Sequence, residues 1–363
     1  MTHRRNDPAA LLEDSPADQW VPDPLPGCSR RTLPLGEDEE GPFCATLVRF
    51  EERPGPGTSQ VETTDPKLAP QAPVPKAPVL HLHGWSDYFY NLPLARLWAE
   101  QGHPFYALDL RRYGRSLREG QTPGYIEDLA HYDADLEAAL EVIAAEHPQA
   151  PLPVVQGHST GGLIAALWAE RHPGRAGALV LNTPWLEVPG DAAARAALEG
   201  LLTPLSHLSP KRAMKLPVMD NYWKSLSDQA HGEWSLHPRW RPRNSFPMTS
   251  GWLKAVLAGH RAVHDGLHLQ IPVLVLLSAA TKYRRQWSEE LLEHDSVLDV
   301  DLLARRAMKV GRHVTVVRLR RALHDVFASE AAVRQEAFDE VSRWLRAYAP
   351  EAEPLPSWST AAP

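Results

Sequence analysis

The stretch VVQGHSTGGLIAALWAE, residues 154–170, places a serine between two glycines, after a short apolar run and before a segment of helical composition. A strand-to-helix turn this tight forces an unfavourable backbone angle at Ser159. Side chains at Gly157 and Gly161 would collide with the neighbouring strand and helix. The turn lifts the serine hydroxyl clear of the sheet and aims helix N–H groups at it. The stretch therefore predicts a strand–turn–helix unit that presents a nucleophilic serine.

Short apolar runs alternate with helical patterns along the rest of the chain. Between the runs, the segment 125–148 repeats apolar residues in steps of three and four, which gives one apolar stripe. Strands that are apolar throughout and alternate with helices indicate a mostly parallel sheet covered on both faces, an α/β fold. The runs are VLHLHG (79–84), PFYALDL (104–110), LPVVQGHS (152–159), AGALVLNTPW (176–185), IPVLVLLSAA (271–280) and HVTVVRLRRALH (313–324).

Composition divides the 363 residues into four parts. Residues 1–42 are rich in Pro, Asp and Glu and predict a loosely ordered arm. The strand–helix core is expected over 43–188 and 271–348, and 349–363 predicts a flexible tail. Between the two core segments, 189–270 lacks strand–helix units and carries scattered tryptophans, histidines and prolines. We predict that this insertion forms a small helical cap over one edge of the sheet.

Charge and composition indicate a globular protein and argue against a nucleic-acid partner and a membrane-spanning segment. Hydrophobic residues make up 43% and charged residues 23% of the chain, as in soluble globular proteins. The net charge of −7 and the lack of a run of basic residues argue against a nucleic-acid partner. The apolar run 271–280 is too short to cross a bilayer, and the first residues show no secretory signal. We expect a cytoplasmic protein without a transmembrane segment; peripheral contact with lipid stays open.

Metal and disulfide chemistry are not expected. Cys28 and Cys44 are the only cysteines, too few for a disulfide scaffold or a cysteine zinc site. His81 and His83 lie in one apolar run, where strand alternation would point both the same way. Without a nearby carboxylate or third histidine, core packing is favoured over a metal site. The sequence predicts neither metal nor cofactor.

A serine attacks a carbonyl only when a base takes its proton. His324 stands just past the last apolar run, in a turn before the closing helix, and is the predicted base. A tetrahedral oxyanion also needs two donors. The loop after the first central run reads His83-Gly84-Trp85, so the backbone N–H groups of Trp85 and Thr160 are the predicted pair. Taken alone, the histidine could cap a helix and His-Gly could be a simple turn.

Four motifs resemble one known family. HGW at 83–85, DLRRYGRS at 109–116, GHSTGG at 157–162 and the late HD at 324–325 resemble the α/β-hydrolase superfamily. Their order and spacing are similar to its monoacylglycerol lipase and lysophospholipase branch, over roughly residues 44–347.

The resemblance implies an α/β-hydrolase fold with a cap. It also implies nucleophile Ser159, base His324, and oxyanion donors Trp85 and Thr160. Asp109 and Arg111 fall in a loop that such proteins use to brace the site, and we interpret them as structural.

The triad acid departs from the family pattern. It normally follows the strand written here as 271–280, but residues 281–285 contain no carboxylate. QWSEELLEH (286–294) looks like a helical detour. The next residues, DSVLD (295–299), resemble the family's aspartate, short apolar stretch and second acid. We therefore predict Asp295 as the acid, reached through an inserted excursion.

Other carboxylates compete for this role. Asp299 and Asp301 follow closely, and Glu187 comes after the preceding strand, where some hydrolases hold their acid. Asp295 itself could instead cap a helix.

The predicted function is cleavage of carboxylic esters through a Ser-His-Asp acyl-enzyme, on monoacylglycerol- or lysophospholipid-like substrates. The cap tryptophans could form an acyl-binding roof or simply the core of the cap. Alternatives are an aminopeptidase or acyltransferase on the same framework, and a non-catalytic hydrolase-like binding protein. A peptidase needs an acidic anchor for the substrate amine, and Glu233 is the candidate in the cap.

Overall fold

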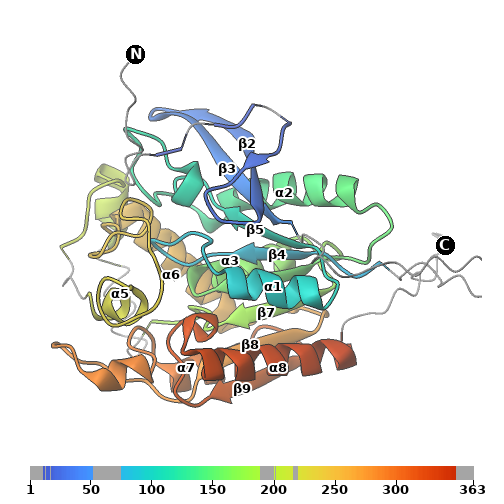
Figure 1. The fold of residues 1–363 in the computed structure, drawn as a ribbon. Coiled ribbons are helices and arrows are strands. Elements are labelled where there is room, and N and C mark those ends of the chain that lie inside the picture. The colour runs from blue at the N-terminus through green and yellow to red at the C-terminus, as the bar shows by residue number, and fades with distance from the viewer. Residues whose placement is uncertain are drawn as a thin grey trace, which may run out of the picture.

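The computed structural model describes residues 11–12, 14–16, 18–51, 75–188, 200, 202–215 and 220–348. Their strands form one nine-stranded sheet in the order β1-β2-β3-β5-β4-β6-β7-β8-β9 (Figure 1). From β5 to β9 in this order every pair is parallel, whereas β1, β2 and β3 pair antiparallel and β3 joins β5 antiparallel. The bounds are β1 (Val21–Pro22), β2 (Cys28–Asp38), β3 (Gly41–Phe50), β4 (Val79–Leu82), β5 (Phe105–Asp109), β6 (Val154–His158), β7 (Ala178–Asn182), β8 (Val273–Ser278) and β9 (Val314–Leu319).

Helices cover both faces of this sheet. On one face lie α1 (Leu92–Glu100) and α8 (Ala331–Tyr348), on the near side in Figure 1. The other face carries α2 (Asp133–Glu146), α3 (Thr160–Arg171), α6 (Ser250–Asp265) and α7 (Val300–Ala307).

Side chains of the parallel strands alternate between the two cores. In β8, Leu274 and Leu276 pack toward α1 and α8, while Val275 and Leu277 pack toward α3 and α6. Both sets are buried, which is why the strands read as continuous apolar runs. The predicted mostly parallel α/β sheet is confirmed.

The prediction of a loosely ordered arm over residues 1–42 is wrong for its described second half. β2 and β3 form a long hairpin that extends the sheet, and Cys28 and Leu33 are buried beneath it. Some of the residues that suggested disorder are exposed, namely Pro34 beside a bulge and Asp38 at the turn, whereas the side chain of Asp23 is buried. Residues 1–10, 13, 17 and the predicted tail 349–363 lie outside the described residues.

The predicted cap boundary also needs correction. α6 falls within 189–270, yet its Val256 and Val263 are fully buried in the same core as α3. Gly259 allows the close approach, since a Cβ there would lie 2.9 Å from Leu167 Cδ1. α6 therefore belongs to the helical layer of the core. The described cap consists of a helical turn at 202–208, α5 (Asn221–Leu226) and connecting loops; 189–199 and 216–219 lie outside the description.

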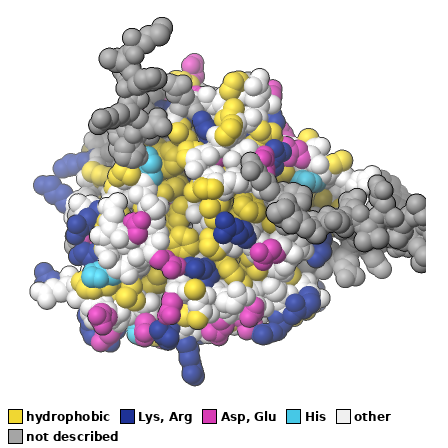
Figure 2. All heavy atoms as spheres, in the orientation of Figure 1, with side chains coloured by type: hydrophobic (Ala, Val, Ile, Leu, Met, Phe, Trp, Pro, Cys, Tyr) yellow, Lys and Arg dark blue, Asp and Glu magenta, His cyan; other side chains and the backbone are white. Residues whose placement is uncertain are grey.

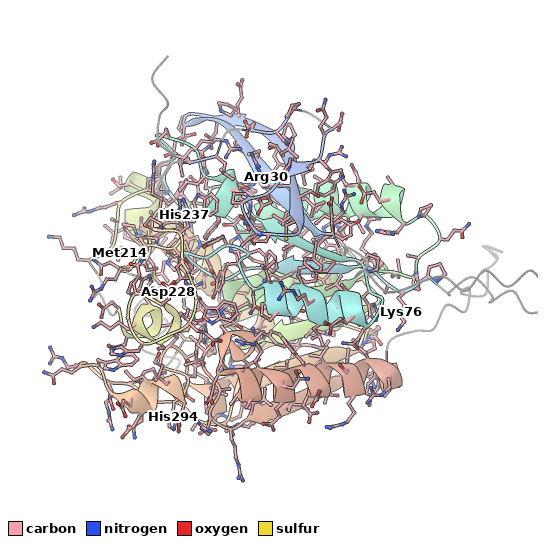
Figure 3. The ribbon with its side chains drawn as sticks, viewed as in Figure 1. Arg30, Lys76, Met214, Asp228, His237 and His294 are labelled. Atoms are coloured by element: carbon pink, nitrogen blue, oxygen red, sulfur yellow. The ribbon has the colours of Figure 1, made fainter. Side chains whose placement is uncertain are left out.

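The tryptophans of the predicted insertion 189–270 pack in two different places. Trp234 and Trp240 pack on Tyr90 and Tyr88, with ring centroids 5.4 and 5.1 Å apart, and form the core that joins cap to sheet. Trp252 in α6 instead packs at a tilt against Trp85, the residue predicted to supply an oxyanion donor, with ring centroids 3.8 Å apart. Figure 3 shows the cap residues Asp228 and His237 on the side of the molecule where α5 lies.

Charged side chains of both signs are interspersed on the face shown in Figure 2, around apolar side chains near its middle. No helix in the described segments combines the length and apolar character needed to span a membrane.

Candidate active site

The serine turn has the geometry that its glycines predict. Ser159 has φ 52° and ψ −117°, in the left-handed half of backbone space, between β6 and α3. A Cβ at Gly157 would lie 2.4 Å from the carbonyl oxygen of Gly161, and one at Gly161 would lie 2.3 Å from that of His83. Side chains are therefore excluded at both glycines. The turn holds Ser159 above the carboxyl end of the central strand.

The hydroxyl of Ser159 faces the predicted base. The Oγ atom lies 3.0 Å from His324 Nε2, and His324 Nδ1 lies 2.9 Å from Asp295 Oδ2. Asp295 is fully buried, and its other oxygen accepts the backbone N–H groups of Val297 and Leu298 at 2.7 and 2.8 Å. With both carboxylate oxygens engaged, the imidazole is held with Nε2 toward the serine. The structure thus brings together the three residues predicted as a triad.

Backbone hydrogen bonds explain how Asp295 reaches this position. The chain leaves the end of β8, makes an excursion over 282–294 and returns. Asp295 N donates to Ala280 O at 3.1 Å, and Lys282 N donates to Asp295 O at 2.8 Å. The excursion contains the short 3-10 helix η3 (Glu289–Leu292). The last residue of the excursion, His294, is labelled in Figure 3. The acid is therefore distant from β8 along the chain but adjacent to its carboxyl end in space.

The competing carboxylates have other partners. Asp299 caps α7 by accepting Leu302 N at 2.9 Å. Asp301 pairs with Arg318 on the surface at 2.5 Å, and buried Glu187 pairs with Arg306 at 2.8 Å. The catalytic role of Asp295 stays a prediction.

The predicted oxyanion donors lie on two segments that meet at the serine. Thr160 is the first residue of α3, and Trp85 follows Gly84 in the loop after β4. A Cβ at Gly84 would lie 3.2 Å from Ser159 Cβ, so this loop passes directly beside Ser159. Among the described residues, neither amide N–H has a hydrogen-bond partner. Both are available to an oxyanion, and their role as donors stays a prediction.

Comparison with known proteins agrees with this geometry. Residues 73–303, more than half of the chain, match the family model described as Hydrolase_4, serine aminopeptidase S33. The chain belongs to this family. Its fold is the α/β-hydrolase fold, as the sheet order and the serine turn already indicated.

Individual relatives are more distant. A monoacylglycerol lipase of Mycolicibacterium smegmatis is 32% identical over 111 residues, which is 30% of this chain and only 38% of the length of that curated relative. A monoacylglycerol lipase from Paleococcus ferrophilus has a TM-score of 0.55 at 17% identity, covering 75% of this chain and 96% of its own. A thermostable carboxyl esterase from Bacillus coagulans has a TM-score of 0.57 at 14% identity, covering 88% and 99%. These structures are similar in fold.

Asn182, which the sequence analysis missed, braces the turn carrying His324. Asn182 at the end of β7 donates its amide to Asp325 Oδ1 at 2.6 Å, and its Oδ1 accepts Val326 N at 3.1 Å. Asn182 O also accepts Ser159 N at 3.0 Å, so one residue holds both the serine turn and the histidine turn. The sequence signal that could have identified Asn182 is its position at the carboxyl end of β7, the strand beside β6.

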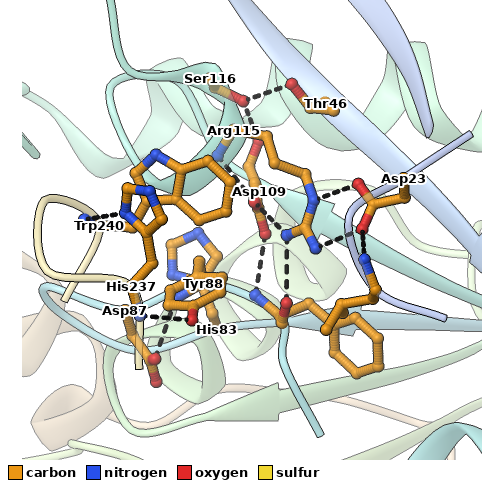
Figure 4. Close-up of polar contacts among 12 residues, drawn as sticks. Asp23, Thr46, His83, Asp87, Tyr88, Asp109, Arg115, Ser116, His237 and Trp240 are labelled. Atoms are coloured by element: carbon orange, nitrogen blue, oxygen red, sulfur yellow. Dashed lines mark hydrogen bonds and ion pairs between the residues drawn. The ribbon is translucent and has the colours of Figure 1, made fainter. Parts of the chain in front are cut away.

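Asp109 and Arg111, interpreted as structural, are both engaged in buried pairs. Arg115 donates to Asp109 at 2.8 Å and to Asp23 at 2.6 Å, and Asp109 accepts Phe89 N at 2.9 Å (Figure 4). Arg111 donates to Asp135 of α2 at 2.7 Å. Asp23, from the region predicted to be loose, is thus locked beneath the loop after β4.

His81 and His83 do not share an orientation, contrary to the expectation from strand alternation. β4 ends at Leu82, so His83 lies in the following loop. There its Nε2 accepts Leu110 N at 3.1 Å, which makes Nδ1 the donor to Gly84 O at 2.8 Å. His81 packs between Phe89 and Phe105. His83 therefore shapes the loop beside the serine, and His81 belongs to the core.

Buried histidines predict acid sensitivity of the fold. Burial lowers the pKa of His81 to about 3 and that of His260 in α6 to about 4. In the unfolded chain both titrate near 6.5, so between these values the unfolded state binds more protons. The stability that the neutral forms of His81 and His260 contribute is therefore fully present above about pH 6.5 and is lost as the pH falls below it. We expect the free energy of unfolding to drop by about 1.4 kcal/mol per pH unit for each histidine.

Urea denaturation between pH 4.5 and 7.5 measures this slope. His81→Gln and His260→Gln should each remove about one histidine's share of it. A slope unchanged in both variants would contradict the prediction.

Proposed function

We propose that this protein is a serine hydrolase that cleaves carboxylic esters through an acyl-enzyme. The observation that carries the proposal is the 3.0 Å contact between Ser159 Oγ and His324 Nε2, with Asp295 on the opposite nitrogen of the imidazole. A hydroxyl held in strained backbone beside a buried imidazole is the arrangement that nucleophilic catalysis requires.

The proposed reaction follows from these positions. His324 Nε2 takes the Ser159 proton as Oγ attacks the ester carbonyl, and Asp295 stabilises the imidazolium that forms. The amides of Trp85 and Thr160 donate to the oxyanion, each contributing about 2.7–4 kcal/mol to the stabilisation of the transition state. The imidazolium then protonates the departing alcohol. Water, activated by the same histidine, releases the carboxylic acid.

The proposed substrates carry a single acyl chain, as in monoacylglycerols and lysophospholipids. Aromatic rings pack around the side chain of Trp85 in the loop after β4: its ring centroid lies 3.8 Å from that of Trp252 and 6.1 Å from that of Phe246. An apolar cluster beside the proposed oxyanion donors suits an acyl chain, and the relatives named as monoacylglycerol lipases support the same class. Location in the cytoplasm stays a prediction from the sequence.

A fluorophosphonate probe and a series of p-nitrophenyl esters test the proposal. We expect one probe per chain, mapped by mass spectrometry to the peptide containing Ser159, together with saturable ester turnover. Denatured protein is the control for non-specific labelling. Native protein that neither labels nor turns over any ester would favour the alternative, a non-catalytic binding protein.

An aminopeptidase or acyltransferase is the second candidate, because the family description names a serine aminopeptidase. The predicted amine anchor, Glu233, forms an ion pair with Arg334 of α8. Its carboxylate is therefore already engaged, which favours the esterase. If the protein released p-nitroaniline from aminoacyl anilides faster than it released alcohol from esters, the aminopeptidase would be favoured over the esterase.

A further inference from the structure

Two aromatic rings contact the imidazole of His324, and one of them comes from the cap. The ring of His158, at the end of β6, lies 5.0 Å from the imidazole between centroids. The ring of Tyr222, in α5, lies 5.2 Å away and meets the imidazole edge-on. His324 is only 2% exposed. The cap therefore reaches the proposed base directly, through the side chain of Tyr222.

Two side-chain hydrogen bonds locate the same imidazole. Nδ1 is bonded to Asp295, and Nε2 faces the hydroxyl of Ser159. In the proposed reaction the second contact is broken and re-formed, because Nε2 takes the serine proton and then passes it to the departing alcohol. During these steps the imidazole is held by Asp295 and by the packing around its ring. A displacement of about 1 Å in a reacting group can cost about 100-fold in rate, so this packing matters for the rate.

Arg241 of the cap packs on the same tyrosine. Its guanidinium lies 5.3 Å from the centroid of the Tyr222 ring, within the distance of about 6 Å at which a cation is attracted to an aromatic ring. The guanidinium is fixed in turn, because Arg241 is only 6% exposed and forms an ion pair with buried Asp87 in the loop after β4. The Tyr222 ring thus contacts both a fixed cation and the imidazole.

The part of the cap that carries these two residues is attached to the core. Trp234 donates its indole N–H to Ala328 O at 2.8 Å, in the turn that follows His324. The backbone N–H of Phe246 donates to Ser86 Oγ at 2.9 Å, in the loop after β4. These bonds lie on either side of Arg241 in the sequence. The cap segment is therefore tied to both loops that border the serine.

The hydroxyl of Tyr222 has no part in this attachment. It is buried and has no hydrogen-bond partner among the described residues. An unpaired buried polar group costs free energy, so the hydroxyl does not hold the ring in place. The ring is held by its packing. Removal of the ring and removal of the hydroxyl alone should therefore have different effects.

We propose that Tyr222 is a positioning residue of the reaction. Its ring, held by Arg241 and by the anchored cap, keeps the imidazole of His324 in the orientation in which Nε2 meets Ser159. The inference rests on the proposed function and gives the cap a part in the catalytic geometry. The tyrosine acts through the imidazole and not on the ester. Its loss therefore slows the chemical steps and leaves the affinity for substrate unchanged.

The test uses two esters of different length, p-nitrophenyl acetate and p-nitrophenyl octanoate. Tyr222→Ala should lower kcat by about 100-fold and by the same factor for both esters, with KM changed by less than about threefold. Fluorophosphonate labelling of Ser159 should slow in parallel, because it requires the same imidazole. Tyr222→Phe retains the ring and loses only the unpaired hydroxyl, so its kcat should stay within about threefold of the native value.

Two further variants separate positioning from damage to the fold. Trp223→Ala is the matched control, because it removes the next aromatic side chain of α5, whose ring lies 5.7 Å from the guanidinium of Arg243. Its kcat should match that of the native protein. Tyr222→Leu refills most of the apolar volume without the ring and should still lower kcat by about 10-fold or more. All rates are measured well below the thermal midpoint of each variant.

Several results would overturn the inference. Tyr222→Ala and Tyr222→Leu could keep the native kcat, or Tyr222→Phe or Trp223→Ala could lose as much as Tyr222→Ala. A loss that differs between the two esters, or that appears in KM, would place the tyrosine in the substrate site instead. Absence of ester turnover and of Ser159 labelling in the native protein would overturn the proposed function itself.

Discussion

Replacing Ser159 with alanine is expected to lower kcat for p-nitrophenyl esters by about 10⁶-fold, the loss typical of Ser-His-Asp hydrolases without their nucleophile. The variant keeps the oxyanion donors and the binding surfaces, so a small residual rate over water should remain. Steady-state kinetics and loss of fluorophosphonate labelling measure the effect. The alanine methyl group fits the same backbone position, and a thermal midpoint close to that of the native protein should accompany the lost activity.

Ser342→Ala on α8 is the matched control, because among the described residues the Ser342 hydroxyl bonds only the Phe338 carbonyl within the same helix. Both activity and labelling should survive in it. Ester turnover that persists in Ser159→Ala, or labelling that moves to another residue, would contradict the assignment of the nucleophile.

Asp295→Asn is expected to lower kcat by about 10⁴-fold with little change in the fold. An amide at this position can donate to His324 Nδ1, which favours the tautomer that carries its proton on Nε2. That nitrogen could then no longer accept the Ser159 proton. Fluorophosphonate labelling should slow in parallel with ester turnover, because both require the activated serine.

The competing carboxylates provide the comparison for this variant. Asp299→Asn should lower stability through the weakened cap of α7, by about 1 kcal/mol or less, and leave kcat within a few-fold. Glu187→Gln should lower stability because Arg306 loses its buried partner, again with kcat largely retained. If Asp295→Asn retained activity while one of these two lost it, the excursion over 282–294 would have no part in placing the acid.

The serine turn could be predicted because its constraint is local. Gly157 and Gly161 are required by backbone atoms within a few residues or on the adjacent strand, so the pattern is visible in one short stretch. The same holds for the parallel strands, whose two-sided burial leaves continuous apolar runs. Predictions of this kind depend little on the rest of the chain.

The errors came from contacts between distant segments. The hairpin of β2 and β3 was hidden because exposed residues such as Pro34 and Asp38 suggested disorder, and because Asp23 finds its partner in Arg115 far along the chain. The pairing of Arg241 with Asp87 is also set by the tertiary fold. Neither carries a spacing or periodicity that a single sequence displays.

Asp295 was predicted as the acid from the family resemblance. No local sequence pattern shows that the excursion returns to the end of β8. The return depends on the two backbone bonds around Ala280 and Lys282.

Those two backbone hydrogen bonds also have a consequence for the residues of the excursion that lies between them. Both ends of the excursion are hydrogen-bonded to each other beside the end of β8. The number of residues between them therefore does not determine the position of the Asp295 carboxylate. Lengthening such a tethered loop costs only a fraction of a kilocalorie for moderate changes in length. The exposed stretch 283–286 is thus a place where this chain can gain or lose residues, and with them new surface, while Asp295, His324 and Ser159 keep their positions; Leu291, fully buried, anchors the later part of the excursion.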